Sequence, residues 1–443
     1  MRLNDIQAAP SPRAPRRRLR IALIGDCAAT RAGPGNLGFS GQDVAVGQLA
    51  HELARGGHAI DVYARRDAPG QPQVAQLGDN IRLIRVPAGP PCPLRKEHTL
   101  AHVDAFSRFV ARFVRRQPDR YDIVHAHSFM AGAVAQHLKE TLGLPFAVSL
   151  HAPGRLRARA RAASDPFSSA RIRLEGALMH TADRIVAECP QDRTDIAQIY
   201  GAPGARIELV PRGFSPGELW PVPMLDARAR LGLEPDRFVV LQLGRMAPRK
   251  GIDTVIQGVA MLRHRHGLDA QLLVVGGDTG DSGRGAPLSD SPELARLRSL
   301  AADLGMAAHV RFMGAQPRHL LRDYYSAANV FASTPWYEPV GITPLEAMAC
   351  ARPVIGSEVG GIKCTVDDGV TGFLVPSRDP EALAERLARL HRHPQLARAM
   401  GEAGRRRACE DTTWHHVAAQ LLAIYTDVLD EARMAGQAAV FPT

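Results

Sequence analysis

The feature of this sequence that most constrains its fold is a regular alternation that begins at Arg20. Short runs of β-branched and apolar residues alternate with longer stretches of helical periodicity. Short apolar runs separated by helices indicate parallel strands whose sheet is covered on both faces. Helical spacing is clearest at 44–55 and 103–115. The pattern therefore predicts an α/β fold of the doubly wound type.

Two such series follow each other along the chain. A polar stretch at 218–236, with three prolines, separates them and is expected to be a linker. Strands are expected at 21–24, 60–63, 81–86, 123–125, 146–150, 184–187 and 207–209, and then at 239–243, 272–275, 310–313, 330–332, 353–356 and 372–375. Because one architecture repeats, we expect two facing lobes with a cleft between them and ligands at the carboxyl ends of the strands.

The two ends of the chain are expected to stand outside these series. Residues 1–18 combine proline, serine and an arginine run without a hydrophobic period, which predicts a disordered basic leader. The first lobe is expected at 19–217 and the second at 237–410. The helix expected at 411–435 has no strand of its own to cover, so we expect it to pack back on the first lobe.

Composition argues against a membrane-spanning or exported protein. The chain has 443 residues, of which 45% are hydrophobic and 23% charged, as in globular proteins, and no stretch is apolar enough to span a bilayer. Its first apolar run, 21–24, is interpreted as a core strand and not as a signal peptide. The six cysteines show no metal-type spacing. We therefore expect a cytoplasmic protein without a bound metal.

The net charge of +10 raises the question of a polyanionic partner. No basic motif interleaved with aromatic residues is present, and 51 of the 55 basic residues are arginines, which suggests a coding bias. We therefore expect no nucleic acid as a partner. The leader and the arginine-rich stretch 155–161 could touch anionic lipid, but no apolar face accompanies them, so at most a peripheral membrane contact is expected.

A basic turn follows the strand expected at 239–243. It contains Arg245 and Lys250 between Gly244 and Gly251, and the glycines allow the backbone to bend. Arginine offers a planar fork for two phosphate oxygens and lysine a point charge, so the pair suits a diphosphate. The alternative is a solvated basic turn, which is common for short motifs.

The segment PWYEPVGITPLEAM at 335–348 offers a helix start with a carboxylate in its first turn. Thr343 is interpreted as the N-cap, Pro344 as the first helical residue and Glu346 as the capping-box carboxylate. Glu346 therefore has a structural explanation. Gly341 precedes this cap, and unpaired N–H groups at the helix start could also face an anion.

Glu338 in the same segment has no comparable structural duty. It lies in a loop after the strand expected at 330–332, where a carboxylate could accept hydrogen bonds from sugar hydroxyls. Further glycine turns follow strands at 276–278 and 360–363, which places a nucleotide on this rim of the second lobe. In the first lobe, the glycine-rich loop 33–42 is expected to be a mobile lid over the cleft.

His151 follows the strand expected at 146–150 and therefore lies at the ligand-binding edge of the first sheet. A lone histidine at such a place is often a packing or capping residue. The other histidine pairs fit no zinc spacing and are interpreted as surface or packing residues: His125/His127, His264/His266, His391/His393 and His415/His416.

Taken together, these motifs resemble the large family of retaining glycosyltransferases with two facing Rossmann-like lobes, the GT-B type of group 1 and family 4. The resemblance covers nearly the whole chain from Arg20, and its most specific part is a pair of glutamates with seven residues between them, Glu338 and Glu346. It implies that Glu338 contacts the donor sugar and Glu346 the ribose. It also implies that Arg245 and Lys250 bind the diphosphate and that His151 lies beside the anomeric carbon of the donor.

The family pattern assigns further positions on both lobes. Donor-binding positions implied by the resemblance include Gly41, Gly244, Gly341, Ile342 and Thr343, the last three through their backbone. The branch with sucrose-phosphate synthase and sucrose synthase is most similar, in Arg95-Lys96-Glu97 and in GGIKCTVDDGVTGFLVPSRDP. In its phosphate-accepting members, residues like Lys96 and Arg171 hold the acceptor's phosphate, and Gln42 lies on the same side.

The chain departs from this branch in two acceptor-side segments. Ser40-Gly41 stands where a glycine pair is usual, and the segment 98–101 replaces an aromatic-rich one. The resemblance implies transfer of a hexosyl unit from a nucleotide diphosphate sugar, with UDP-glucose favoured, to a hydroxyl acceptor that could be a sugar phosphate. It requires no metal, cofactor or buried nucleophile. A catalytically idle nucleotide-sugar-binding protein and an epimerase on the same fold stay open as alternatives.

Overall fold

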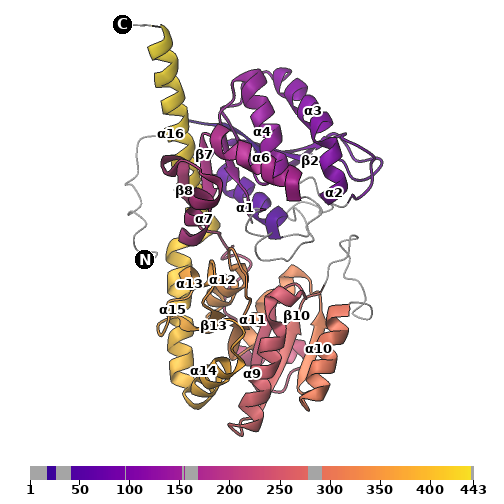
Figure 1. Cartoon of the computed structure of the whole chain (residues 1–443), viewed down its shortest axis with the longest axis vertical. Coiled ribbons are helices and arrows are strands. Elements are labelled where there is room, and N and C mark those ends of the chain that lie inside the picture. Colours follow the sequence, from indigo (N-terminus) through magenta and orange to yellow (C-terminus); the bar gives the residue numbers. More distant parts are fainter. Residues whose placement is uncertain are drawn as a thin grey trace. The chain divides into compact units, whose positions relative to one another are not determined.

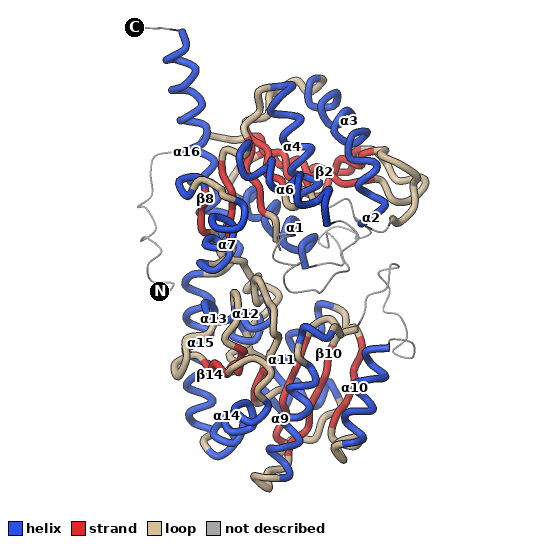
Figure 2. Tube along the Cα trace, viewed as in Figure 1, coloured by secondary structure: helices blue, strands red, loops and turns tan. Residues whose placement is uncertain are grey.

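The computed structural model describes residues 17–25, 41–94, 96–151, 154, 168–277 and 292–440, with only the backbone for 41–43, 96, 168 and 436–440. The chain forms two compact units. Unit 1 comprises Met1–Gly213 together with Trp414–Thr443, and unit 2 comprises Phe214–Thr413. In each unit the strands form a sheet flanked by helices, as the red and blue segments of Figure 2 show. Both units are Rossmann-like, which confirms the predicted fold class.

Among the described residues of unit 1, eight strands form one sheet in the order β3-β4-β2-β1-β5-β6-β7-β8. Their bounds are β1 (Arg20–Ile24), β2 (Ala59–Arg65), β3 (Val74–Gly78), β4 (Ile81–Val86), β5 (Ile123–Ala126), β6 (Phe146–Ser149), β7 (Arg184–Ala187) and β8 (Ile207–Leu209). All neighbours pair in parallel except the edge strand β3, which runs antiparallel to β4 and was not predicted from the sequence.

The helices of unit 1 cover both faces of this sheet (Figure 1). They are α1 (Gly41–Arg55), α2 (Lys96–Thr99), α3 (Val103–Arg115), α4 (Phe129–Leu142), α6 (Ser168–Thr181), α7 (Pro190–Tyr200) and α16 (Trp414–Val440), with 3₁₀ turns η2 (Leu100–His102) and η3 (Gly204–Arg206). Along β1, Ile21 and Leu23 pack toward α1 and α16, whereas Ala22 and Ile24 pack toward α3 and α4. This alternation explains why the strand is a continuous apolar run. The C-terminal helix α16 thus completes the core of unit 1.

Unit 2 holds a second parallel sheet of six strands within its described residues, in the order β11-β10-β9-β12-β13-β14. The strands are β9 (Phe238–Leu243), β10 (Ala270–Val275), β11 (Val310–Gly314), β12 (Val330–Ser333), β13 (Val354–Ser357) and β14 (Gly372–Val375). The helices are α8 (Met224–Leu231), α9 (Ile252–His264), α10 (Pro292–Asp303), α11 (Arg318–Ala327), α12 (Ile342–Ala349), α13 (Ile362–Thr365), α14 (Pro380–Arg392) and α15 (Pro394–Asp411), with the 3₁₀ turn η4 (Pro248–Lys250). The stretch 218–236, expected to be a linker, contains α8 and is part of this unit.

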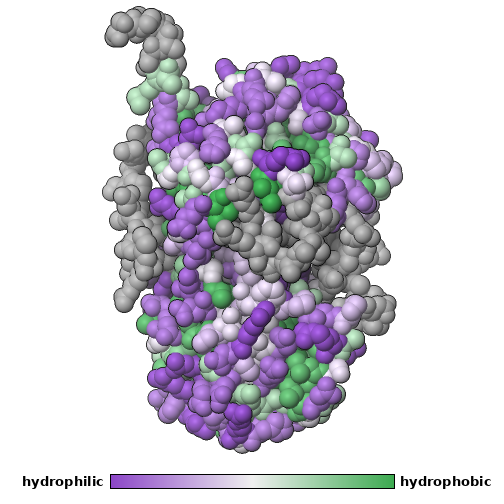
Figure 3. All heavy atoms as spheres, viewed as in Figure 1, coloured by the Kyte–Doolittle hydropathy of each residue, from purple (hydrophilic) through white to green (hydrophobic). Residues whose placement is uncertain are grey.

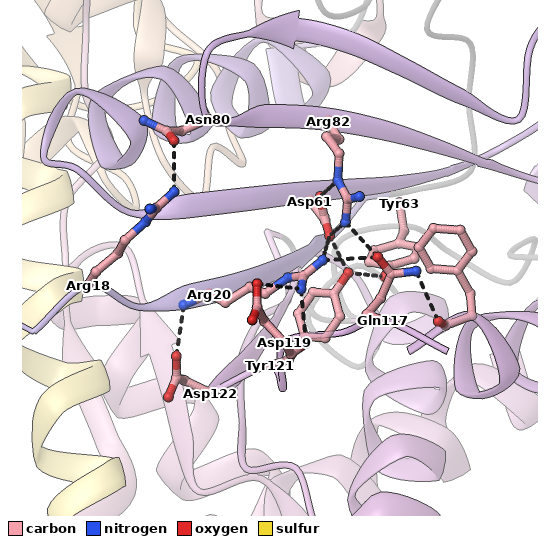
Figure 4. A network of polar contacts seen from close by, with 11 residues as sticks. Arg18, Arg20, Asp61, Tyr63, Asn80, Arg82, Gln117, Asp119, Tyr121 and Asp122 are labelled. Carbon is pink, nitrogen blue, oxygen red and sulfur yellow. Dashed lines mark hydrogen bonds and ion pairs between the residues drawn. The ribbon is translucent and has the colours of Figure 1, made fainter. Parts of the chain in front are cut away.

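A polar network around the buried Asp61 joins the strands β1, β2 and β4 to the segment that precedes β5 (Figure 4). Asp61 on β2 receives two hydrogen bonds from Arg82 on β4, of 2.7 and 2.6 Å, and another from Tyr121. Arg20 at the start of β1 adds a contact of 3.3 Å. Because the Asp61 side chain is only 4% exposed, these partners compensate a charge that would otherwise be costly to bury.

The described surface carries mainly polar side chains. On the face drawn in Figure 3, hydrophilic residues predominate on each unit and apolar ones form small patches between them. None of the helices within the described ranges is long and apolar enough to cross a membrane.

Candidate functional site

In unit 2, the loops that follow the two neighbouring strands β9 and β12 carry the predicted donor-side residues. The chain passes from β9 outward to β10 and β11, and then returns to β12 on the other side of β9. Such a reversal of strand order is where doubly wound sheets bind ligands. The loop after β9 contains Arg245 and Lys250, and the loop after β12 contains Glu338. The structure therefore places these predicted residues at the switch point of one sheet.

Lys250 and Glu338 meet directly across this point. The Lys250 ammonium donates a hydrogen bond to Glu338 Oε2, and Arg249 Nη1 lies 3.7 Å from the same oxygen. Arg249 Nη1 also donates to the carbonyl of Tyr337, at 3.1 Å. The side chains of Lys250 and Glu338 remain 18% and 14% exposed, so both can still reach a ligand. An ammonium has three protons, and this contact uses one of them.

Glycines allow these loops to approach each other closely. Gly251 has φ +64°, and a Cβ there would lie 1.9 Å from the carbonyl oxygen of Thr334. Thr334 Oγ1 in turn donates to the carbonyl of Gly251, at 2.9 Å. At Gly360, φ is +47° and a Cβ would lie 1.9 Å from the carbonyl oxygen of Glu338. The position of Lys250 and Glu338 thus depends on backbone that only glycine accommodates without strain.

Arg245 differs from Lys250 in being free of internal partners among the described residues. Its side chain is exposed, and it follows Gly244, which adopts φ +149°. Gly244 donates from its N–H to the carbonyl of Val275, at 2.9 Å, which holds the start of the turn against β10. An exposed guanidinium beside a fixed turn is available to bind an anion.

The start of α12 corrects the capping prediction for Thr343. The helix begins at Ile342, and its N-cap is Gly341 in the left-handed region (φ +74°) without a side-chain cap. Thr343 is therefore a residue of the first turn, and Pro344 follows it inside the helix. The prediction was wrong because the helix begins two residues earlier than a threonine cap would allow. Gly341 takes the N-cap position in a left-handed conformation that glycine adopts without strain, and no side chain caps the helix. The N–H groups of the first turn still point out of the helix, as an anion site requires.

Glu346 likewise has a structural role other than the capping box. It is the fifth residue of α12 and is 5% exposed. Tyr325 donates from its hydroxyl to Glu346 Oε2 at 2.8 Å, and Arg318 Nη1 donates to Oε1 at 3.2 Å. Arg318 also bonds Glu218, at 2.7 Å. Burial beside Glu346 raises the pKa of the Tyr325 hydroxyl well above its usual value, so it stays a donor.

In unit 1, His151 belongs to a buried cluster at the carboxyl ends of four adjacent strands. His127 follows β5, His151 follows β6, Glu188 follows β7 and Arg212 lies shortly after β8. His151 Nδ1 lies 2.7 Å from Glu188 Oε1, and Arg212 Nε lies 2.7 Å from that same oxygen. His151 Nε2 lies 3.3 Å from His127 Nδ1. Both nitrogens of the His151 ring are therefore engaged inside the protein.

The charge states of this cluster follow from its burial. Burial opposes ionisation of Glu188, but Arg212 and His151 outweigh it and lower the pKa of that carboxyl to about 2. Burial lowers the pKa of His125 to about 3 and that of His127 well below its usual value, so both rings are neutral. His125 bonds Tyr425 of α16 at 2.6 Å and Ser149 at 3.0 Å. The pair expected to be packing or surface residues is thus part of the core.

The predicted acceptor-side residues are described to different extents. Arg171 is 6% exposed and pairs with Glu175 at 2.6 Å, and Tyr200 donates to the same carboxylate. Gly41 and Gln42 begin α1 and Lys96 begins α2, and the structure describes only the backbone of these three residues. The loop 33–40 and the stretch 155–161 also lie outside it.

Sequence reasoning missed Glu188, Arg212, Arg318 and Tyr325. Glu188 could have been found, because it directly follows a correctly predicted strand, as His151 does. Arg318 and Tyr325 lie on α11 and contact Glu346 on α12. These contacts depend on the tertiary structure, and no residue pattern within either helix predicts them. Within the described ranges, no three or more histidine, cysteine or acidic side chains gather in a way that could hold a metal ion.

Comparison with known proteins agrees with this arrangement in both units. Residues 224–407 match the family described as "Glycosyl transferases group 1", and residues 40–213 match the "Glycosyl transferase 4-like domain". The chain is 33% identical over 433 residues to D-inositol 3-phosphate glycosyltransferase of Acidothermus cellulolyticus, covering 97% of this chain and 94% of that protein. It is 34% identical to the protein of the same name from Kineococcus radiotolerans, covering 92% and 94%.

Solved structures show the same fold. Sucrose-phosphate synthase from Thermosynechococcus elongatus superposes with a TM-score of 0.80 at 30% identity, covering 94% of this chain and all of that one. Anabaena HepE, solved in complex with UDP-glucose, superposes with a TM-score of 0.70 at 17% identity, covering 93% of this chain and all of that one.

Proposed function

The chain belongs to the glycosyltransferase group 1 family, and we propose that it transfers a hexosyl unit, with retention, from UDP-glucose to a hydroxyl of a phosphorylated sugar or cyclitol. That it is a glycosyltransferase using a nucleotide sugar follows from the family and from its named relatives. The proposed acceptor class is supported by the phosphate in the names of two relatives, D-inositol 3-phosphate glycosyltransferase and sucrose-phosphate synthase. The proposed donor is supported by the UDP-glucose bound to HepE.

The observation that carries the proposal is the meeting of Lys250 and Glu338 at the switch point of the second sheet. In the proposed complex, Arg245, Lys250 and the first turn of α12 surround the diphosphate with positive charge. Glu338 keeps one contact to Lys250 and accepts hydrogen bonds from hydroxyls of the donor sugar. Glu346, held by Tyr325 and Arg318, presents its remaining acceptor capacity to the ribose.

The proposed reaction exchanges one bond at the anomeric carbon for another. The bond from this carbon to the diphosphate oxygen breaks, a bond to the acceptor oxygen forms, and the acceptor's proton passes to the leaving diphosphate. Charge builds on that diphosphate, so preorganised cations lower the barrier; one such donor is typically worth about 10²–10³ in rate. This proposal requires no metal and no protein nucleophile.

On the acceptor side, we propose that Lys96 and Gln42 of unit 1 contact the acceptor, with Lys96 at its phosphate. Arg171 could take part only while sharing its guanidinium with Glu175, because that ion pair is buried. We propose that His151 lies beside the transferred sugar. The proposal thus gives unit 2 the donor and unit 1 the acceptor.

The proposal is tested with the purified full chain and a matrix of donors and acceptors. UDP-, GDP- and ADP-sugars are first ranked by thermal stabilisation, since a ligand at about 100 times its dissociation constant adds about 2.7 kcal/mol to the free energy of unfolding. The best donor is then incubated with phosphorylated and unphosphorylated sugars and cyclitols. We expect UDP-glucose to rank first and only phosphorylated acceptors to yield product; a preference for another donor or for neutral acceptors would contradict this assignment.

A further inference from the structure

The backbone of His151 adopts a conformation that residues other than glycine uncommonly adopt. Its φ is +53°, in the left-handed region, which costs a non-glycine residue about 1–2 kcal/mol. Such strain persists only where surrounding contacts over-determine the conformation, and it is concentrated at functional sites. The contacts that hold His151 therefore indicate which residues serve it.

Three side chains hold the ring, and each comes from a different strand end. Glu188 Oε1 lies 2.7 Å from Nδ1, and His127 Nδ1 lies 3.3 Å from Nε2. Arg212 reaches the cluster from beyond β8, with Nε 2.7 Å from Glu188 Oε1 and Nη2 3.4 Å from His151 Nδ1. Three independent elements thus define the position and rotation of one imidazole.

The chemistry of the partners fixes where the ring proton lies. A carboxylate can only accept, and the pKa of Glu188, lowered to about 2, keeps it ionised at neutral pH. His151 Nδ1 must therefore carry a proton and donate it to Glu188. With Nδ1 protonated, Arg212 Nη2 and His151 Nδ1 are two donors that lie 3.4 Å apart. The carboxylate offsets their repulsion, because His151 Nδ1 and Arg212 Nε each lie 2.7 Å from Glu188 Oε1.

We propose that Glu188 and Arg212 are positioning residues for His151: the buried Glu188–Arg212 ion pair holds the His151 ring in one orientation with its proton on Nδ1. This inference rests on the proposed function, in which His151 acts beside the transferred sugar. Arg212 compensates the buried carboxylate, and without it the His151 ring would be the one side-chain partner that the described residues give the Glu188 carboxylate. Neither residue touches the donor or the acceptor in this account.

The first arm of the test is spectroscopic and needs no activity. ¹⁵N-histidine NMR of the full chain reports which ring nitrogens carry protons, and His151→Asn assigns the signal, since asparagine tolerates positive φ better than other non-glycine residues. We expect a protonated Nδ1 in the wild type and a changed ring signal in Glu188→Gln. An unprotonated Nδ1, or a ring signal that Glu188→Gln leaves unchanged, would overturn the proposal.

The second arm is kinetic. In the wild-type background, Glu188→Gln is expected to lower kcat about tenfold or more, with less than a twofold change in the KM for the donor. In a His151→Asn background the same substitution should have almost no effect on kcat, because Glu188 acts through the His151 ring. Equal losses in both backgrounds would mean a merely structural role. Asp61→Asn is the matched control, a buried paired carboxylate in the same unit, which should leave the His151 signal unchanged.

Two further variants keep the test decisive if Glu188→Gln folds poorly. Arg212→Lys should keep most of kcat and Arg212→Met should not, and Glu188→Gln/Arg212→Met should fold better than Arg212→Met alone, because the double variant buries no unpaired charge. A double variant no better folded than Arg212→Met would contradict the pairing. A wild type that transfers no sugar from any nucleotide donor would overturn the proposed function, whereas the NMR arm would still decide whether Glu188 holds the ring.

Discussion

Replacing Asp192 by asparagine should change the pH dependence of stability in a direction set by its surroundings. Asp192 lies in the first turn of α7 and accepts a hydrogen bond of 3.0 Å from the backbone N–H of Glu188. Burial, assisted by the charges of Glu188 and Asp195, raises the pKa of its carboxyl from 3.8 to about 7. The folded chain therefore keeps this proton over a range in which the unfolded chain releases it.

The sign and size of the effect follow by linkage. The stabilisation from neutral Asp192 is fully present below about pH 4 and is lost as pH rises through 7. Three pKa units correspond to about 4 kcal/mol, and about two-thirds of this falls between pH 5 and 8. Because the side chain is only partly buried, we halve the figure for solvent screening and expect about 1–2 kcal/mol.

The assay is urea unfolding followed by circular dichroism at pH 5 and pH 8, on the wild type and on Asp192→Asn. Asparagine still accepts the N–H of Glu188 but does not titrate, so the variant should gain about 1–2 kcal/mol on the wild type between the two pH values. Other titrating groups are common to both proteins and cancel in the difference. A stability difference that is the same at both pH values, or that favours the wild type at pH 8, would refute the reasoning.

Three further predictions, one of them with a control variant, follow from other parts of the chain. Asp61→Asn should lower the free energy of unfolding by about 3 kcal/mol in chemical denaturation, because it leaves buried arginine charge uncompensated; a loss below 1 kcal/mol would count against the network. Gly251→Ala should cost more than about 2 kcal/mol and abolish donor binding, since its Cβ would meet the Thr334 carbonyl at 1.9 Å. Gly232→Ala, with similar φ and no atom within 4 Å of the new Cβ, should cost about 1 kcal/mol and leave donor binding intact. Exhaustive chelation with EDTA should leave glycosyl transfer unchanged, and activity restored only by added metal would contradict the metal-free proposal.

Much of the fold could be predicted because its information is local. The strands at β4, β7, β8 and β14 have the predicted bounds, and the others differ by one or two residues at their ends. The central strands, such as β1, β10 and β12, are apolar runs buried on both faces, as expected for covered parallel strands. The edge strand β3 escaped prediction because its residues are partly exposed and show no such run. That the two lobes face each other across a cleft stays a prediction.

The candidate site was predictable only where a residue's place in the chain reveals its place in the fold. Arg245, Lys250 and Glu338 follow strands, so the carboxyl-end rule found them. The N-cap at Thr343 was wrong because the pattern Thr-Pro-x-Glu is a good local cap, but a left-handed Gly341 begins the helix earlier.

Tertiary partners explain the remaining differences. The carboxylate of Glu346 is held by Arg318 and Tyr325, which stand more than twenty residues away in the sequence. The stretch expected to be a linker differs for a similar reason, since α8 within it packs against α11 in the core of unit 2 despite the neighbouring prolines. Such contacts arise from packing between elements, and no spacing within one segment encodes them.

The central claim, that the Lys250 and Glu338 site binds the diphosphate of the donor, is tested most directly by one rate measurement. Initial rates of glycosyl transfer from saturating UDP-glucose are compared for the wild type, Lys250→Ala and the control Arg265→Ala, whose cation pairs with Glu381 on the surface. The account predicts a loss of about 10²–10³ in kcat for Lys250→Ala with an unchanged fold, and wild-type turnover for the control. Wild-type turnover by folded Lys250→Ala would contradict it.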